Sequence, residues 1–293
     1  MLDLANMLIS DFNLNNSINF EENINIDILD NLTSEEDMTT VIAIKCNEGV
    51  IIASDTQSTA GDTKNIMASK IFVVNKYIGI GCAGFTGHID SLVDKMKKKL
   101  YDGLITDAET RRTINDGLLE LHKQYNIEYA KKAGYKTGVH NFKAHGLLGT
   151  KLKDNTYGLY LLLPYSKDLV IPTVLPIHDY MSIGTGSRYA NFMFKTQFRV
   201  LSTISQKPVS SLPMDFLIWI VTYIINEIKE TDVYSGGHTN ISIINKYGWQ
   251  NIPKDTILKH YDDGIQMICK GLSQSFKNRN LAENFLHNMF PRP

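Results

Sequence analysis

The sequence is poor in cysteine and shows no pattern of metal ligands. Its three cysteines, Cys46, Cys82 and Cys269, are odd in number and far apart, which is not the pattern of a disulfide framework. No Cys/His pair has zinc-ligand spacing, and no two of the eight histidines are four residues apart. We therefore expect a reducing, cytoplasmic setting, no metal site and no cofactor.

Long hydrophobic runs are also missing. The longest strongly apolar run, Phe216–Ile225, has ten residues, whereas a helix that crosses a bilayer needs about 20. The first residues do not combine a basic segment with an apolar stretch, as a signal peptide does. With 43% apolar and 21% charged residues, the composition is that of a globular protein with one large core. We expect Phe216–Ile225 to lie in a buried helix.

Residues 1–38 lack basic side chains altogether. They hold nine Asp or Glu, eight Asn and no Lys or Arg, so we expect an acidic leader or propeptide outside the fold. The rest of the chain carries all 30 Lys and Arg. Four of them, Lys95, Lys97, Lys98 and Lys99, fall on one expected helix without interleaved aromatic residues. This arrangement favours a solvated helix face over a nucleic-acid surface.

Strand-like and helix-like segments come in blocks from residue 39 onward. The expected strands are 39–45, 50–54, 71–74, 77–82, 147–151, 157–163 and 240–245; the expected helices are 89–100, one that opens at the capping box 106–109, 188–198 and 214–229. Such blocks favour stacked sheets between helix layers, an α+β four-layer αββα sandwich, over a parallel βαβ sheet. We divide the chain into the leader 1–38, one domain 39–248, and a tail 249–293 that is partly helical.

Two motifs near the start of this domain resemble a known family. Residues 39–44 are TTVIAI and residues 49–59 are GVIIASDTQST. Their spacing is similar to the opening of proteasome β subunits and of the bacterial HslV peptidase, which are N-terminal-nucleophile hydrolases. In that family a threonine becomes the first residue, and an acidic residue follows it sixteen positions later. The resemblance assigns these places to Thr39 and Asp55.

Further motifs follow in the family's order, up to about residue 246. Lys70 precedes an apolar strand, although the loop before it is one residue shorter than in the family. Residues 83–87, AGFTG, resemble the turn whose backbone N–H, here that of Gly84, forms the oxyanion hole. Residues 182–187, SIGTGS, carry Thr185 where the family usually has serine, and residues 232–237, DVYSGG, supply Asp232 and Ser235.

The resemblance implies a threonine peptidase. A free α-amine, with a pKa of about 7.7–8.0, can take the proton of the Thr39 hydroxyl at neutral pH, which an amide nitrogen cannot do. Lys70 would stabilise the threonine oxygen, Asp55 would hold the lysine, and the N–H of Gly84 would bind the oxyanion. Asp232 and Ser235 would orient the amine and relay protons, and Thr185 would lie in the turn beside the nucleophile. No cofactor is implied.

Three other functions agree with parts of the sequence. Residues 184–189, GTGSRY, could be read as a dinucleotide-binding turn, but Tyr189 stands in the place of the third glycine. A non-catalytic α-type ring subunit would share the fold, yet the residue before Thr39 is Met38, where α subunits have glycine. An acyl-threonine could also be attacked by an amine, so an enzyme that transfers amides stays open.

The resemblance also predicts substrates and partners. Ser58, Thr59, Cys82 and Thr86 would line the substrate-binding pocket, and their small uncharged side chains do not demand a charged residue. The expected partners are peptide or unfolded-protein substrates, further ring subunits, either identical or different, and an ATPase unfoldase, with no nucleic acid and no membrane.

The sequence leaves two routes by which Thr39 could become the N-terminal residue. One is self-cleavage of a propeptide, and the other is translation from Met38 followed by removal of that methionine. A methionine directly before Thr39 favours the second route.

Overall fold

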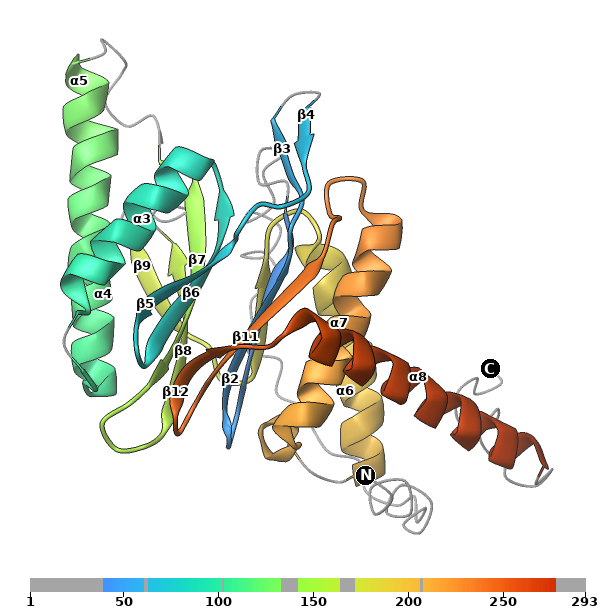
Figure 1. Cartoon of the computed structure of the whole chain (residues 1–293). Coiled ribbons are helices and arrows are strands. Elements are labelled where there is room, and N and C mark those ends of the chain that lie inside the picture. Colours follow the sequence, from blue (N-terminus) through green and yellow to red (C-terminus); the bar gives the residue numbers. More distant parts are fainter. Residues whose placement is uncertain are drawn as a thin grey trace, which may run out of the picture.

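The computed structural model describes residues 39–277, apart from 61–62, 102, 133–141, 164–171 and 206–207. The expected leader 1–38 and the end of the expected tail lie outside the described residues. Within them, two antiparallel five-stranded sheets lie between helices on either side, which is the expected α+β αββα sandwich (Figure 1). The helices α3 and α4 cover one sheet, and α6 and α7 cover the other.

The first sheet is built around the N-terminal hairpin. Its strands are, in spatial order, β10 (Tyr180–Ile183), β1 (Val41–Cys46), β2 (Gly49–Asp55), β11 (Thr239–Asn245) and β12 (Gly248–Asn251). In this order β11 pairs with β2 so that Thr239 lies opposite Asp55. The start of β11 and the end of β2 therefore come together at one end of these paired strands, although they are far apart in the chain.

The second sheet follows chain order. Its strands are β5 (Ile71–Asn75), β6 (Ile78–Gly84), β7 (Ala144–Lys151), β8 (Tyr157–Leu163) and β9 (Thr173–Pro176), and each pairs with the next. A separate two-stranded ribbon, β3 (Ser58–Ala60) with β4 (Thr63–Asn65), projects between the two sheets in Figure 1. This ribbon leads the chain from Asp55 to Lys70.

The helices form the outer layers. They are α3 (Thr86–Lys99), α4 (Asp107–His122), α5 (Ala130–Lys132), α6 (Ser187–Ser205), α7 (Met214–Thr231) and α8 (Lys254–Lys277), with a π-helix at Lys123–Tyr129 and a 3-10 turn at Val209–Ser211. The predicted capping box of α4 is confirmed, because Thr106 and Glu109 satisfy each other's backbone N–H groups. Two lysines of α3, Lys95 and Lys99, pair with Glu120 on α4, as expected of a solvated helix face.

The buried apolar residues form three layers of core. One lies between the sheets and includes Val41, Ile52 and Leu161, while the others lie between each sheet and its helices. The apolar run Phe216–Ile225 is confirmed as part of α7, which packs on the first sheet.

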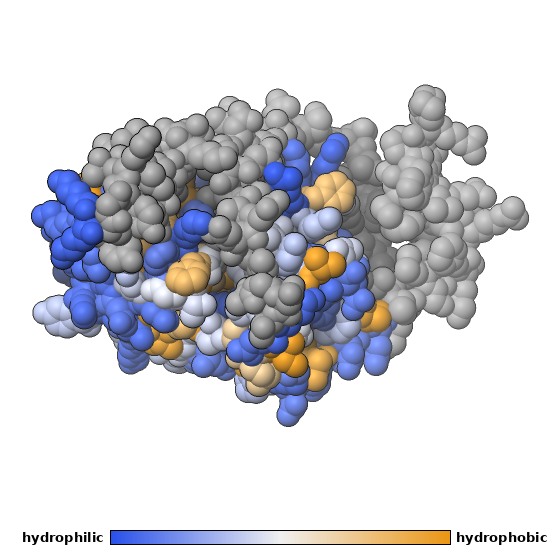
Figure 2. Space-filling model, turned by 90° about the horizontal axis from the view of Figure 1, so that it is seen from above, coloured by the Kyte–Doolittle hydropathy of each residue, from blue (hydrophilic) through white to orange (hydrophobic). Residues whose placement is uncertain are grey.

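Among the described helices, none is long and apolar enough to cross a membrane. On the face seen in Figure 2, hydrophilic residues predominate and hydrophobic ones are scattered.

The outer strands of the two sheets add to the sequence-based expectations. The expected strand 240–245 is present as β11, but β12, which was not expected, lies beyond it and forms the edge of the first sheet. The expected strand 71–74 is present as β5, and its Val73 is 42% exposed. The strand β5 lies at the edge of its sheet, where α3 covers only one face.

Candidate active site

Thr39 and Thr40 lead into β1 and are held from several sides. The Thr39 side chain, only 4% exposed, donates a hydrogen bond to Oδ1 of Asp55 at 3.3 Å. The same oxygen accepts the backbone N–H of Thr40 at 2.9 Å. On the other side, the carbonyl oxygen of Thr39 accepts the N–H of Gly186 at 3.4 Å. The position of Thr39 is thus fixed by residues that lie much further along the chain.

Asp55 lies at the end of β2 and is completely buried. Its Oδ1 lies 2.6 Å from Nζ of Lys70, while Oδ2 accepts the backbone N–H of Gly236 at 2.9 Å. Burial lowers the pKa of Lys70, and the carboxylates of Asp55 and Asp232 act in the opposite direction. An amine whose pKa is lowered in this way gives up its proton more readily than an exposed lysine does.

A second carboxylate, Asp232, lies just after α7 and is also buried. Its Oδ2 accepts the hydroxyls of Ser235 at 2.7 Å and Thr185 at 3.0 Å. The hydroxyl of Ser235 lies 2.8 Å from that of Thr40. A continuous hydrogen-bonded chain therefore runs from Asp232 through Ser235 to the residue that follows Thr39.

The turn that carries Thr185 depends on two glycines. Gly184 has a φ of +91°, and a Cβ there would lie 2.1 Å from the carbonyl oxygen of Thr39. A Cβ at Gly186 would lie 1.9 Å from Oγ1 of Thr40. Other side chains would push this turn away from β1. The Thr185 hydroxyl lies 3.4 Å from the carbonyl oxygen of Thr39 and 3.0 Å from Oδ2 of Asp232, so it contacts both Thr39 and the second carboxylate.

Gly84, the predicted oxyanion residue, ends β6 with a φ of +128°. A Cβ there would lie 2.5 Å from the carbonyl oxygen of Lys143. Both the conformation and the close neighbour require glycine at this position. Its role toward an oxyanion stays a prediction.

The four residues predicted to bind substrate differ in exposure. Cys82 is completely buried in the core beneath α3 and α4, and burial raises the pKa of its thiol. Thr86 is exposed at the start of α3, Ser58 is partly exposed on β3, and Thr59 lies on the same ribbon. None of the four lines the cavity beside residues 232–236 or the cavity between α7, α8 and β11, both of which are described below. Their shared pocket stays a prediction.

Sequence reasoning missed several residues of the site. The side chain of Gln57 donates to the carbonyl oxygen of Val233 at 3.0 Å and so supports the segment between Asp232 and Ser235. Thr40 contributes its hydroxyl, as described above, although the sequence predicts only that it forms part of a strand. Lys64 donates to the same carbonyl as Gln57, at 3.3 Å. The pairings of Gln57 and Lys64 depend on the ribbon β3–β4, which local patterns did not reveal.

A cavity of about 330 Å³ opens beside this segment. It is lined by Gln57, Lys64, Lys229, Glu230, Thr231, Asp232, Val233, Ser235 and Gly236. Within the described residues, no group of three or more His, Cys, Asp or Glu side chains could hold a metal ion. The polar side chains that surround Thr39 carry hydroxyls, carboxylates and the ammonium group of Lys70.

Comparisons with known proteins agree on one family. Residues 36–244 match the model of the proteasome subunit family. The proteasome subunit beta of Methanosphaera stadtmanae is 24% identical over 231 residues, which is 78% of this chain and 96% of that protein. The HslV subunit of an ATP-dependent protease from Borreliella burgdorferi is 28% identical over 156 residues, 52% of this chain and 72% of that protein. A proteasome subunit alpha of Methanoculleus marisnigri is 36% identical, but over only 59 residues, 20% of this chain and 25% of that protein.

Proposed function

This chain belongs to the proteasome subunit family, and on that premise we propose that it is a catalytic subunit that cuts peptide bonds with the hydroxyl of Thr39. The observation that carries the proposal is the buried arrangement of Thr39, Asp55 and Lys70. One carboxylate oxygen of Asp55 accepts from both the Thr39 hydroxyl and the Lys70 ammonium. Buried charged groups with shifted pKa values cluster at functional sites, which supports a catalytic subunit over one that only builds a ring.

The proposed reaction begins when the α-amine of an N-terminal Thr39 takes the proton of its own hydroxyl. The oxygen attacks the peptide carbonyl, the tetrahedral oxyanion accepts the N–H of Gly84, and the amine returns the proton to the leaving nitrogen. Water then hydrolyses the acyl-threonine ester. Lys70 stabilises the negative charge that develops on the threonine oxygen, and Asp55 keeps the ammonium in place.

The second carboxylate has a separate role in this proposal. Asp232 holds the hydroxyls of Ser235 and Thr185; the first lies 2.8 Å from the hydroxyl of Thr40, and the second lies 3.4 Å from the carbonyl oxygen of Thr39. These hydroxyls can pass a proton along the chain toward the amine of Thr39. Because Asp232 is buried and already accepts three hydrogen bonds, its main effect is to orient these groups.

A non-catalytic subunit is the second candidate. The similarity to proteasome alpha subunits supports it, but that similarity covers only 20% of this chain. The similarity to a proteasome beta subunit extends over 78% of the chain. We further propose that the chain forms a ring in the cytoplasm, encloses the Thr39 sites, and receives unfolded protein from an ATPase.

The test determines the N-terminal residue of the protein and measures its peptide-cleaving activity. The intact mass and first residue of the purified protein are measured, and cleavage of fluorogenic peptides is followed in wild type, Thr39→Ala and Thr39→Ser. We expect a species that begins at Thr39 and cleaves peptides, no cleavage by the alanine variant, and reduced cleavage by the serine variant. A protein that presents Thr39 at its N-terminus and cleaves none of the peptides would leave the non-catalytic subunit as the better account.

A further inference from the structure

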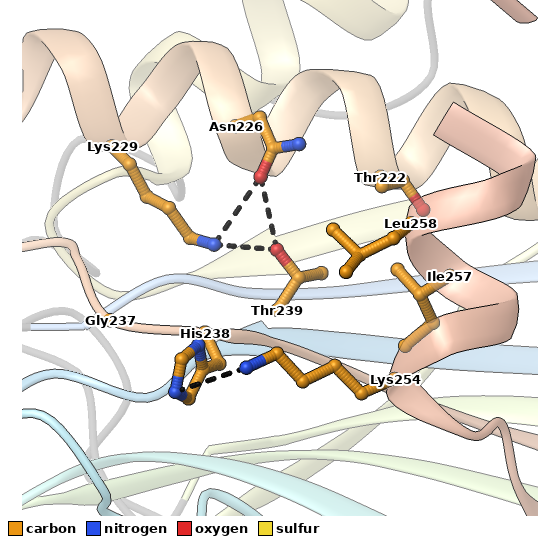
Figure 3. A pocket seen from close by; sticks show the side chains of 9 residues that line it. All are labelled: Thr222, Asn226, Lys229, Gly237, His238, Thr239, Lys254, Ile257 and Leu258. Atoms are coloured by element: carbon orange, nitrogen blue, oxygen red, sulfur yellow. Dashed lines mark hydrogen bonds between the residues drawn. The ribbon is translucent and has the colours of Figure 1, made fainter. Parts of the chain in front are cut away.

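A second cavity lies on the other side of residues 237–239, between α7, the start of α8 and β11 (Figure 3). Its volume is about 190 Å³, well above the roughly 10–15 Å³ that one water molecule requires. The nine lining residues are Thr222, Asn226, Lys229, Gly237, His238, Thr239, Lys254, Ile257 and Leu258. The proposed reaction uses none of them.

The charge of this cavity has one sign. Two lysines and a histidine line it, and none of the nine lining residues is acidic. Lys229 enters from α7 and Lys254 from the start of α8; in Figure 3 the ammonium group of Lys229 points toward Asn226 and Thr239, and that of Lys254 points toward His238. Within the described part of the chain, neither lysine forms an ion pair with a carboxylate.

The partners of Lys229 are neutral. Its Nζ contacts Oδ1 of Asn226 at 3.3 Å and the hydroxyl of Thr239. Lys254 lies 3.4 Å from Nε2 of His238. Burial lowers the pKa of Lys229 to about 8, Asp55 opposes this shift, and the positive charges of Lys254 and Lys70 add to it. Two cations that repel each other in a partly buried cavity are stabilised by a bound anion.

We propose that this cavity, formed by α7, α8 and β11, is a binding site for a small oxyanion of the phosphate type. Lys229 and Lys254 supply charge-assisted hydrogen bonds from two sides, and the hydroxyl of Thr239 supplies a neutral one. The apolar side chains of Ile257 and Leu258 line the α8 side of the cavity, and its volume of about 190 Å³ suits a small ion. The site does not depend on whether Thr39 is catalytic.

The cavity also adjoins the candidate active site. Thr239 is the partner of Asp55 in the pairing of β11 with β2, and the N–H of His238 donates to the hydroxyl of Thr56 at 2.7 Å. The same segment continues backward through residues 232–236. A bound anion therefore lies next to the chain segment that carries the second carboxylate of the site.

The experiment measures binding of inorganic phosphate by titration calorimetry, with the full chain as purified and with chloride at equal ionic strength as the reference. The variants are Lys254→Gln, Lys229→Gln and Lys259→Gln. The last changes an exposed lysine of α8 that does not line the cavity, and so is matched in charge to Lys254→Gln. Circular dichroism and melting temperature show whether each variant is folded.

We expect wild type and Lys259→Gln to bind phosphate saturably and with equal affinity. Lys254→Gln should raise the dissociation constant about tenfold, because it removes one charge-assisted contact. Lys229→Gln, if it folds, should raise the dissociation constant at least as much. If Lys229→Gln does not fold, the comparison of Lys254→Gln with Lys259→Gln decides. Equal affinities in Lys254→Gln and Lys259→Gln, or no saturable binding by wild type, would overturn the proposal.

Discussion

The ammonium group of Lys70 lies 2.6 Å from Oδ1 of Asp55, and both side chains are almost completely buried. A buried carboxylate that loses its cation is left with an uncompensated charge, so Lys70 contributes to the stability of the fold as well as to the charge of the candidate site.

Replacement of Lys70 should therefore affect both activity and stability. Lys70→Ala should reduce peptide cleavage by at least about 10²-fold. It should also lower the free energy of unfolding by about 3 kcal/mol, measured by urea denaturation. Lys70→Arg keeps the positive charge but changes its geometry, so it should retain the fold and still lose most activity. Full activity in Lys70→Arg would argue against a direct role of the amine.

The role of the Thr185 hydroxyl can be tested with one substitution that keeps the hydroxyl and one that removes it. Thr185→Ser keeps the hydroxyl that donates to Asp232 and should leave peptide cleavage within a few-fold of wild type. Thr185→Val keeps the shape but removes the hydrogen bond to a charged group, which is worth about 1.5–3 kcal/mol. We expect this variant to lose activity and stability together. Equal kcat/KM in the two variants would show that the hydroxyl has no part in the reaction.

The titration of Lys229 predicts a pH-dependent stability. Its pKa falls from 10.5 to about 8 on folding. Between these two values the unfolded chain binds more protons than the folded one, so the free energy of unfolding should rise with pH across this window. Lys229→Met should show a smaller rise than wild type in urea denaturation across this pH range, in buffers free of phosphate. Lys259→Met serves as the control and should follow wild type.

Ring formation can be tested on the whole chain by size-exclusion chromatography with light scattering. We expect a mass several times the 33.1 kDa of the chain, alone or after addition of partner subunits. A monomer under every condition, with or without partners, would contradict the proposed assembly.

The route to an N-terminal Thr39 predicts the effect of a change at Met38. If translation begins at Met38, Met38→Leu should abolish the short product that starts at Thr39, as seen by intact mass. Met7 is another methionine of the expected leader and provides a matched control, so Met7→Leu should leave the short product unchanged. Persistence of the short product in Met38→Leu would instead indicate self-cleavage.

Much of the fold followed from local patterns. The strand at 157–163 and the capping box at Thr106 and Glu109 were predicted correctly because each depends on residues within a few positions. The short strands β9, β10 and β12 were missed. β10, for example, exists because Tyr180–Ile183 pairs with β1, which lies far earlier in the chain, and so short a segment carries too little periodicity to reveal such a pairing.

The candidate site, like the fold, was predicted only in part. Thr39, Asp55, Lys70, Thr185, Asp232 and Ser235 were selected by their motifs, and the structure brings all six into one hydrogen-bonded network. Their roles stay predictions. The contact between the Thr40 and Ser235 hydroxyls was not foreseen, because it joins two distant segments that approach each other only when β1 and β11 both pair with β2.

The turn at Gly184 and Gly186 has a practical consequence for protein production. The N–H of Gly186 donates a hydrogen bond to the carbonyl oxygen of Thr39, and the carboxylate of Asp55 accepts the N–H of Thr40. Residues downstream therefore position the first peptide unit of the domain. In a recombinant fusion whose cleavable tag ends directly before Thr39, the proposed nucleophile should therefore already be in position when the tag is removed. Such a fusion would let an experimenter start the reaction at a chosen moment, by addition of the tag-removing protease.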